Sequence, residues 1–439
     1  MAIKPKLGLF DLTMIVVSLV IGMGIFGTPV DVANKASTPT IFFAAWILGA
    51  VVSLFGALTF AEIGSRYHVT GGFYRIFSHC YHPAFAFMVN WMTVISNASS
   101  TAIVAIIGAE YINPLIMPGV DHDLGIKITT ISAIVILYGI NMIGIKMSAR
   151  TLNVLMLIKI TLMILLIGAV FFSSAAPETP SASIPIGTQL NSLWLCFVPV
   201  FFTYGGYQQT MNFGSDVPNA GRTMPRAIFY GIAIILTLYM LINISYYYVL
   251  GMDGMRGSMA LASDMAYVIF GPYASKVIAV VMFLSVMAYV NASIMSNPRV
   301  YYAMAEDKVL PKIFAQLNEK TQVLGFSTSV FVAFMVITLF LTSSFSKVLN
   351  YVMFFDSIAL ISAAAAIFVL RKRAAVSNEL NTDVYKIPFY PWLPLVFIVV
   401  YALVNVSILV SNPFAAMMGF ILFISGWPLF FVLKKIVNG

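Results

Sequence analysis

Long apolar runs recur from one end of the sequence to the other, and they constrain the fold more than any other feature. An α-helix needs about 20 apolar residues to cross the hydrocarbon core of a bilayer. Each run is long enough to do so, and the sequence therefore predicts an all-α membrane protein with about twelve transmembrane helices. The predicted helices lie at roughly 11–35, 41–65, 83–115, 126–147, 151–173, 190–214, 226–252, 274–304, 327–344, 348–371, 388–411 and 413–434.

The composition agrees with a membrane protein and leaves no room for a separate soluble domain. Only 9% of the 439 residues are charged, whereas soluble domains carry about 25%. The apolar run that follows Lys4 and Lys6 is expected to be a retained helix, because it lacks a small-residue cleavage site. We therefore expect a single transmembrane domain over residues 1–439.

Positive charges are distributed unevenly between the predicted loops. With the N-terminus placed in the cytoplasm, 18 of the 24 Lys and Arg residues fall on the cytoplasmic side and five on the outer side. Cytoplasmic loops of membrane proteins carry such an excess. The bias predicts that both termini are cytoplasmic, and it explains the net charge of +8 without a nucleic-acid partner.

Residue types that hold metals or perform catalysis are sparse. The two cysteines, Cys80 and Cys196, and the four histidines form no metal-ligand pattern, and no histidine lies in the middle of a predicted span. The motifs H-E-x-x-H and G-x-S-x-G do not occur in the sequence. We expect no metal, no cofactor and no enzymatic activity.

Glycines interrupt two predicted helices near their middle. Helix 1 contains Ile-Gly-Met-Gly-Ile-Phe-Gly at 21–27, followed by Pro29, and helix 6 contains Phe-Thr-Tyr-Gly-Gly-Tyr at 202–207. A glycine costs about 1 kcal/mol relative to alanine inside a helix, and paired glycines therefore favour local unwinding. The two breaks lie five helices apart, which is the layout expected of two inverted five-helix repeats.

Unwound backbone inside a membrane must face a polar cavity, because lipid cannot satisfy free N–H and C=O groups. The N-terminal end of a half-helix presents N–H groups that suit a carboxylate, and the C-terminal end presents carbonyls that suit an ammonium. An α-amino acid carries both groups. The paired breaks therefore predict a site for a zwitterion, with close helix packing as the other use of such glycines.

Several segments resemble signatures of the amino acid–polyamine–organocation superfamily, especially the L-amino-acid transporter branch and its bacterial relatives. The resemblance covers nearly the whole chain. In the helix 1 segment, Met23 stands where serine or alanine is commoner. The matching segments are 21–26, 61–66 with 70–74, 202–207 continuing through 216–219 to 225–227, and 297–307 with Leu310-Pro311.

The resemblance implies a fold of five plus five inverted helices, in residues 1–173 and 190–371, with two helices appended in 388–439. It implies that N–H groups around Met23, Gly24 and Ile25 bind the substrate carboxylate, and that carbonyls near Ile21, Phe202 and Thr203 bind the amine. Phe202 resembles the aromatic gate of the family. The predicted substrate-binding residues are Ile21, Gly22, Met23, Gly24, Ile25, Phe202, Thr203, Tyr204, Gly205, Gly206 and Asn291.

Two ionisable residues lie deep in the predicted spans, at matching positions of the two repeats. Lys159 lies in helix 5 and Asp356 in helix 10, each about eight residues from the helix start, or roughly 12 Å. A helix 5 lysine recurs in sodium-independent members of the superfamily. The resemblance therefore implies that the Lys159 ammonium replaces a bound sodium ion beside the helix 1 break.

Asp356 matches no residue of the family signatures. By repeat symmetry we expect it near the helix 6 break, where it would be a structural hydrogen-bonding acid, a group that exchanges a proton, or the partner of a substrate ammonium. Glu62, Glu110 and Asp11 lie nearer the helix ends and are expected to be solvated.

These features favour a transporter that works by alternating access in a bacterial inner (plasma) membrane. A channel is the alternative from another class, but channels usually repeat a filter by oligomer symmetry, whereas here the repeat lies within one chain. Small or medium neutral L-amino acids are the predicted substrates, because the helix 6 environment is apolar and aromatic. Cationic amino acids or polyamines, held by Asp356, are the alternative. Exchange, uniport, proton coupling and a heavy-chain glycoprotein partner of the kind found in the family stay open at this point.

Overall fold

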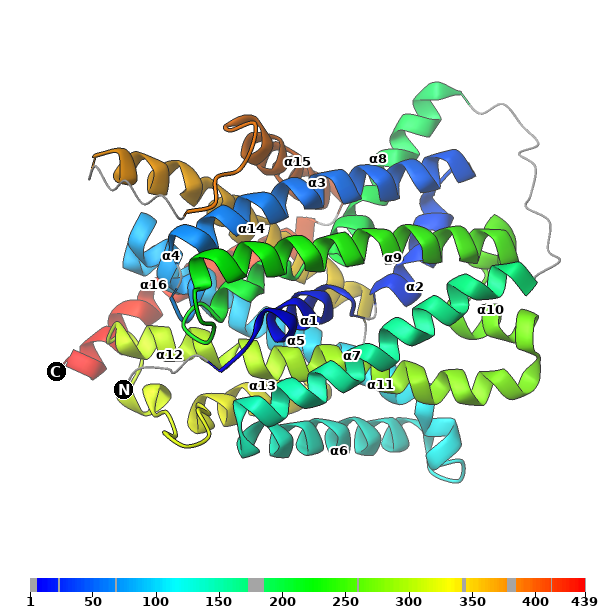
Figure 1. The fold of residues 1–439 in the computed structure, drawn as a ribbon, viewed down its shortest axis with the longest axis horizontal. Helices are drawn as coiled ribbons and strands as arrows, with labels where there is room; N and C mark the ends of the chain where they lie inside the picture. Colours follow the sequence, from blue (N-terminus) through cyan, green and yellow to red (C-terminus); the bar gives the residue numbers. More distant parts are fainter. Residues whose placement is uncertain are drawn as a thin grey trace.

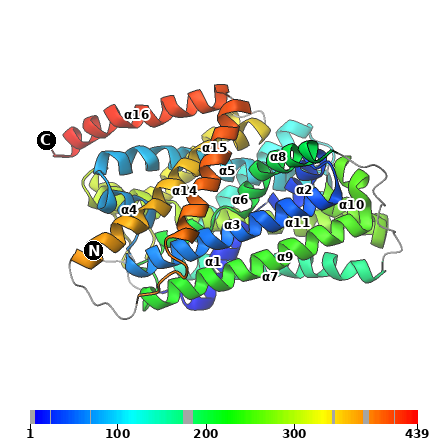
Figure 2. The same ribbon diagram turned by 90° about the horizontal axis from the view of Figure 1, so that it is seen from above.

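The computed structural model describes residues 6–22, 24–67, 69–172, 185–258, 260–341, 345–376, 384–411 and 413–438. Within these ranges the chain forms sixteen α-helices, three short 3₁₀ helices and one isolated β-bridge, between Thr70 and Phe213. The long helices pack side by side as an elongated bundle, and the first and last described segments lie at the same end of it (Figures 1 and 2).

The helices follow one another along the chain with short connections. Their bounds are α1 Leu9–Val20, α2 Gly24–Lys35, α3 Pro39–Arg66, α4 Gly72–Cys80, α5 Pro83–Ile116, α6 His122–Ile143, α7 Ile145–Gly168, η1 Ala169–Phe172, α8 Ile186–Tyr204, η2 Tyr207–Asn212, α9 Ala220–Arg256, α10 Leu261–Phe270, α11 Pro272–Ser296, α12 Pro298–Glu306, η3 Lys312–Ala315, α13 Gly325–Leu341, α14 Phe345–Val376, α15 Trp392–Ser411 and α16 Pro413–Asn438.

The bundle confirms the predicted all-α membrane protein. In the part of the chain that the structure describes, eleven helical segments are long and apolar enough to cross a membrane. The ninth predicted span corresponds to α13, a shorter apolar helix of 17 residues. Twelve spans and an inverted repeat therefore stay predictions.

The first membrane helix is interrupted where its glycines predict. α1 ends at Val20, the backbone of Ile21 leaves the helical region with φ −75° and ψ 75°, and α2 begins at Gly24. The last carbonyls of α1 and the first N–H groups of α2 lack partners within their own helices. Both sets therefore meet inside the bundle.

The sixth membrane helix is interrupted differently. α8 ends at Tyr204, and Gly206 has a φ of 117°, a backbone conformation that residues other than glycine rarely adopt. The chain then continues as the 3₁₀ helix η2 and not as a second α-helix. The prediction of a helix over 190–214 thus holds for its first part, and the second part is wound more tightly.

Two segments that the sequence assigned to loops contain helices. α4 buries Phe73, Tyr74 and Phe77 on one face and packs against α5. α10 packs against α11 on the opposite end of the bundle (Figure 1). Both helices are short, and hydropathy over a window of membrane-spanning length does not detect them.

The expectation that Glu62 is solvated is wrong. Its side chain is fully buried and accepts hydrogen bonds from Arg66 (2.7 Å), from Arg371 (2.6 and 2.8 Å) and from the backbone N–H of Ile387 (2.7 Å). The end of α14 and the segment before α15 cover the end of α3 and exclude water from it. Glu110 is exposed, in agreement with the expectation, and Asp11 is half-buried.

Candidate functional site

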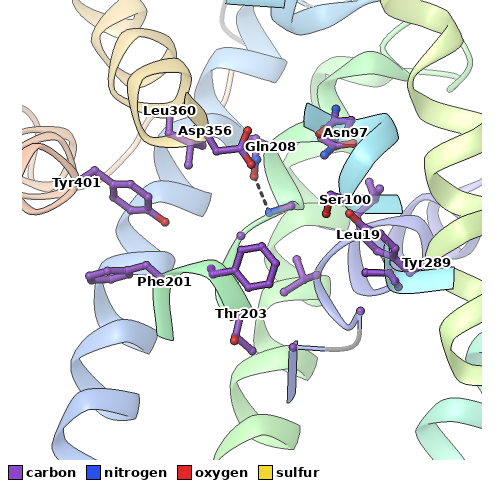
Figure 3. Close-up of a pocket in the computed structure, with 18 residues that line it drawn as sticks. Leu19, Asn97, Ser100, Phe201, Thr203, Gln208, Tyr289, Asp356, Leu360 and Tyr401 are labelled. Carbon is purple, nitrogen blue, oxygen red and sulfur yellow. Dashed lines mark hydrogen bonds between the residues drawn. The ribbon is translucent and has the colours of Figure 1, made fainter. Parts of the chain in front are cut away.

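A cavity lies where the two breaks meet (Figure 3). Its empty space is about 740 Å³, including the part that opens to solvent. The lining residues come from both breaks, from α5 and α11, and from α14 and α15. They are Leu19, Val20, Gly22, Gly24, Asn97, Ser100, Val104, Phe201, Phe202, Thr203, Gly205, Gly206, Gln208, Gln209, Tyr289, Asp356, Leu360 and Tyr401.

The two breaks contact each other directly, and this contact depends on glycine. A Cβ on Gly24 would lie 3.1 Å from the side chain of Thr203, and a Cβ on Gly206 would overlap the carbonyl oxygen of Leu19. A side chain at position 206 would also strain the backbone, because of its positive φ. Glycine at 206 therefore lets the two unwound segments approach closely.

Tyr239 of α9 contacts both breaks. Its buried hydroxyl lies 3.0 Å from the carbonyl oxygen of Val20 and 3.2 Å from that of Thr203. The hydroxyl can donate its single proton to either carbonyl. On the other side, the N–H of Gly206 donates to Oε1 of Gln208 at 2.9 Å, which is the contact drawn in Figure 3.

The backbone polarity at the cavity matches a zwitterion. α2 begins at Gly24, and its first N–H groups carry the positive end of the helix dipole. α1 and α8 both end at the cavity with their carbonyls, which carry the negative ends. A carboxylate is therefore favoured at the start of α2 and an ammonium at the ends of α1 and α8.

Lys159 of α7 lies directly beside the helix 1 break. Its side chain is fully buried, and its Nζ donates to the carbonyl oxygen of Ile21. The ammonium thus binds the unwound backbone at the negative end of α1.

Asp356 of α14 lies beside the helix 6 break. It lines the cavity together with Gly205, Gly206 and Gln208, and Figure 3 shows its carboxylate next to Gln208. Within the described ranges, its carboxylate forms neither an ion pair nor a hydrogen bond. This carboxylate is therefore open to whatever occupies the cavity.

Most of the predicted site residues lie at the cavity or next to it. Gly22, Gly24, Phe202, Thr203, Gly205 and Gly206 line the cavity, whereas Met23 lies outside the described residues. Ile25 is fully buried next to the cavity lining, and Ile21 offers its carbonyl to Lys159. The structure does not test whether any of these residues binds substrate, and these roles stay predictions.

Two other predicted residues pack away from the cavity lining. The Tyr204 ring packs against the rings of Trp46 and Tyr239, and its hydroxyl donates to the carbonyl of Trp46. Asn291 accepts a hydrogen bond from the side chain of Asn141 at 2.7 Å and donates to the backbone of Ser148 at 3.0 Å. Both side chains thus connect helices.

Sequence reasoning missed the polar wall of the cavity. Asn97 and Ser100 of α5, Tyr289 of α11 and Gln208 of η2 all line it. A signal for the α5 residues was present, because Ser-Asn-Ala-Ser-Ser-Thr at 96–101 is a polar stretch in the middle of a predicted span. Polar residues at membrane depth usually face a cavity or the bundle interior.

The segment that follows η2 is held by an ion pair and by backbone hydrogen bonds, at the end of the bundle where the termini lie. A buried ion pair joins Arg299 of α12 to Asp216 (2.7 Å), and the guanidinium lies over the ring of Phe213. The backbone N–H groups of Lys6 and Leu7 donate to the carbonyl of Asp216 at 2.8 and 3.0 Å. The segments before α1, after η2 and in α12 are therefore held together here.

Fold and site together define a multi-pass membrane transporter whose cavity is built on two broken helices. The model of the family described as Amino acid permease matches residues 7–431, and the chain belongs to this family. This confirms the predicted superfamily and a role in amino acid transport, and it excludes an enzyme.

The relatives cover the chain almost completely. It is 27% identical to the serine/threonine exchanger SteT of Bacillus subtilis (strain 168), over 99% of this chain and 98% of that protein. It is 24% identical to the human cystine/glutamate transporter, over 98% of this chain and 85% of the relative. It is 23% identical to the human large neutral amino acids transporter small subunit 2, over 98% and 81%.

Proposed function

We propose that the protein is a sodium-independent secondary transporter that moves small to medium neutral L-amino acids across a membrane by exchange or uptake. Residues 1–439 form one domain, with inverted repeats in 1–173 and 190–371 and two appended helices in 388–439. The excess of basic residues on one side supports cytoplasmic termini, and the bacterial relative SteT supports a bacterial inner membrane.

The observation that carries this proposal is the meeting of the two breaks at one cavity. The N-terminal end of α2 and the C-terminal ends of α1 and α8 face the same space. They offer a carboxylate site and an ammonium site without any charged side chain. An α-amino acid satisfies both at once.

The lining residues favour a neutral side chain on the substrate. They include the apolar Phe201, Phe202 and Leu360 and the neutral polar Asn97, Ser100 and Gln208, which suit a small apolar or hydroxylated side chain. None of the described lining residues is Lys, Arg or His, and an acidic substrate side chain would have no cation to bind. The similarity to a serine/threonine exchanger points the same way.

Lys159 supports independence from sodium. Its ammonium already binds the Ile21 carbonyl that a cation beside the helix 1 break would otherwise coordinate. Oxygen atoms of unwound backbone coordinate the driving ion in related transporter architectures. A second candidate function, transport of cationic amino acids or polyamines, is favoured only by the open carboxylate of Asp356.

Counterflow in proteoliposomes tests the proposed function. Vesicles loaded with an unlabelled neutral amino acid in sodium-free buffer should accumulate the labelled amino acid transiently, with saturation, and empty vesicles should not. Gly206→Ala should abolish this overshoot. Gly139→Ala is the matched control, because a Cβ there meets no atom within 4 Å. Linear, non-saturating flux without an overshoot would instead indicate a channel.

A further inference from the structure

Asp356 is half-buried and differs from the charged side chains that are buried in the bundle. The ammonium of Lys159 binds a carbonyl, Glu62 binds two arginines, and Arg299 binds Asp216. By contrast, the carboxylate of Asp356 has no ion pair or hydrogen bond with any described residue, and it lines the substrate cavity. The fold provides a partner for these other charges and leaves Asp356 open.

Among the described residues that line the cavity with Asp356, none is Lys, Arg or His. Among the groups that line the cavity with it, the titratable ones are the phenols of Tyr289 and Tyr401, from α11 and α15. α14 also packs against α3, α4, α5 and α16. The charged and titratable side chains of these helices do not line the cavity; they are Glu62 and Arg66 on α3, Tyr74, Arg75, His79, Cys80 and Tyr81 on α4, Glu110 and Tyr111 on α5, and Lys434 and Lys435 on α16.

A bare carboxylate at this depth carries a large desolvation cost unless a positive charge neutralises it. The described residues that line the cavity supply no such charge, but the contents of the cavity can supply it. Two chemical species can supply it: a proton bound to the carboxylate, or an ammonium on the substrate side chain. Both would occupy the same place beside the helix 6 break.

We propose that Asp356 is a cation-selecting residue of the substrate site, which carries a proton when the substrate is neutral and binds the second ammonium when the substrate is a dibasic amino acid. This inference rests on the proposed function and adds the substrate class. A neutral amino acid with one proton and a dibasic amino acid without it carry the same net charge. The protein therefore exchanges the two as electrical equivalents.

The charge balance has a direct consequence for pH. The proton binds Asp356 from the aqueous side to which the cavity is open, and it leaves to the other side with the substrate. Transport of a neutral amino acid therefore rises as the pH falls, because its binding requires the protonated acid. Transport of lysine or ornithine falls as the pH falls, because it requires the ionised acid. The two pH profiles run in opposite directions.

The experiment measures uptake of L-serine and of L-ornithine into proteoliposomes from about pH 5.5 to about pH 8, a range in which a desolvated carboxyl can titrate. In the wild type, we expect the two opposite profiles. In Asp356→Asn, serine uptake should lose its pH dependence and ornithine uptake should fall at least about tenfold, because the second ammonium is left unpaired. Asp253→Asn, an exposed acid near the end of α9, is the matched control and should behave as the wild type.

Parallel pH profiles for serine and ornithine in the wild type would overturn the inference, and so would ornithine uptake that survives in Asp356→Asn. If this variant does not fold, the wild type still decides, because ornithine should inhibit serine uptake more strongly as the pH rises. Failure of the proposed function looks different: the wild type would then show no counterflow of any amino acid at any pH.

Discussion

Lys159 and Asp356 lie at matching positions of the two predicted repeats, yet their surroundings in the structure are opposite. Lys159 is fully buried and donates to the unwound backbone at Ile21. Asp356 lines the cavity beside the other break and has no ion pair or hydrogen bond among the described residues. The ammonium of Lys159 is bound by the protein backbone, whereas the carboxylate of Asp356 is open to the cavity.

We infer from this difference that Lys159 stabilises the helix 1 break, whereas Asp356 selects among substrates. The Lys159 ammonium binds the Ile21 carbonyl, at the negative end of α1. A negative charge that depends on the cavity for its partner responds to what the cavity holds. We therefore expect changes at Lys159 to affect all substrates alike, and changes at Asp356 to separate one substrate from another.

The largest effect is expected at the contact between the two breaks. Gly206→Ala should reduce transport by about 100-fold or more, because the added Cβ overlaps the Leu19 carbonyl and shifts both halves of the site. Initial rates of uptake in proteoliposomes, normalised to reconstituted protein, measure this. Gly139→Ala should retain the wild-type rate, and a similar loss in both variants would mean that glycine replacement is harmful in general.

The next largest effect is expected at Lys159. Lys159→Met removes the ammonium and leaves the Ile21 carbonyl without its donor, which should slow uptake of every substrate by about 10- to 100-fold. The reduction should be equal for serine and ornithine and independent of pH. Uptake rates of both substrates across pH check this. A selective loss of one substrate would assign to Lys159 the role that we propose for Asp356.

A smaller effect is expected at Phe202, the predicted gate. Phe202→Ala removes a large ring from the cavity lining, and the turnover rate should fall by about tenfold with a change of only a few-fold in substrate affinity, because occlusion needs the bulk more than binding does. Binding by scintillation proximity and turnover by uptake separate the two. Lost binding with normal turnover per bound substrate would make Phe202 an affinity contact.

The smallest effect is expected from sodium. Replacement of sodium by N-methylglucamine should leave the uptake rate within about twofold, because the Lys159 ammonium already occupies the carbonyl at the break. A steep, saturable dependence of uptake on sodium concentration would contradict the role assigned to Lys159. It would leave the role of Asp356 untouched.

Much of this site could be predicted from local sequence. Paired glycines at Gly22 and Gly24 and at Gly205 and Gly206 mark both breaks, since glycine weakens a helix regardless of its neighbours. The depth of Lys159 follows from counting residues along an apolar run, and its attraction to free carbonyls follows from charge alone. These are properties that a short stretch of chain carries by itself.

The rest depends on which helices become neighbours. The 3₁₀ helix η2 begins directly after Gly206, which lies against the backbone of Leu19, a residue far away in the sequence. Glu62 is buried because Arg371 and Ile387 fold over it, and its position near a helix end gave no sign of this. Asn291 lies in a helix that contributes to the cavity, but its side chain faces Asn141, and one residue of rotation along a helix decides between the two environments.

The most direct test of the account is a structure of the protein with a bound neutral L-amino acid, determined by electron cryo-microscopy in sodium-free buffer. The account predicts substrate density in the cavity between the breaks, with the carboxylate within about 3 Å of the N–H groups at the start of α2 and the ammonium within about 3 Å of the carbonyls that end α1 and α8. Substrate density outside this cavity would contradict it, and so would a substrate bound in the reverse orientation, with its ammonium at Gly24.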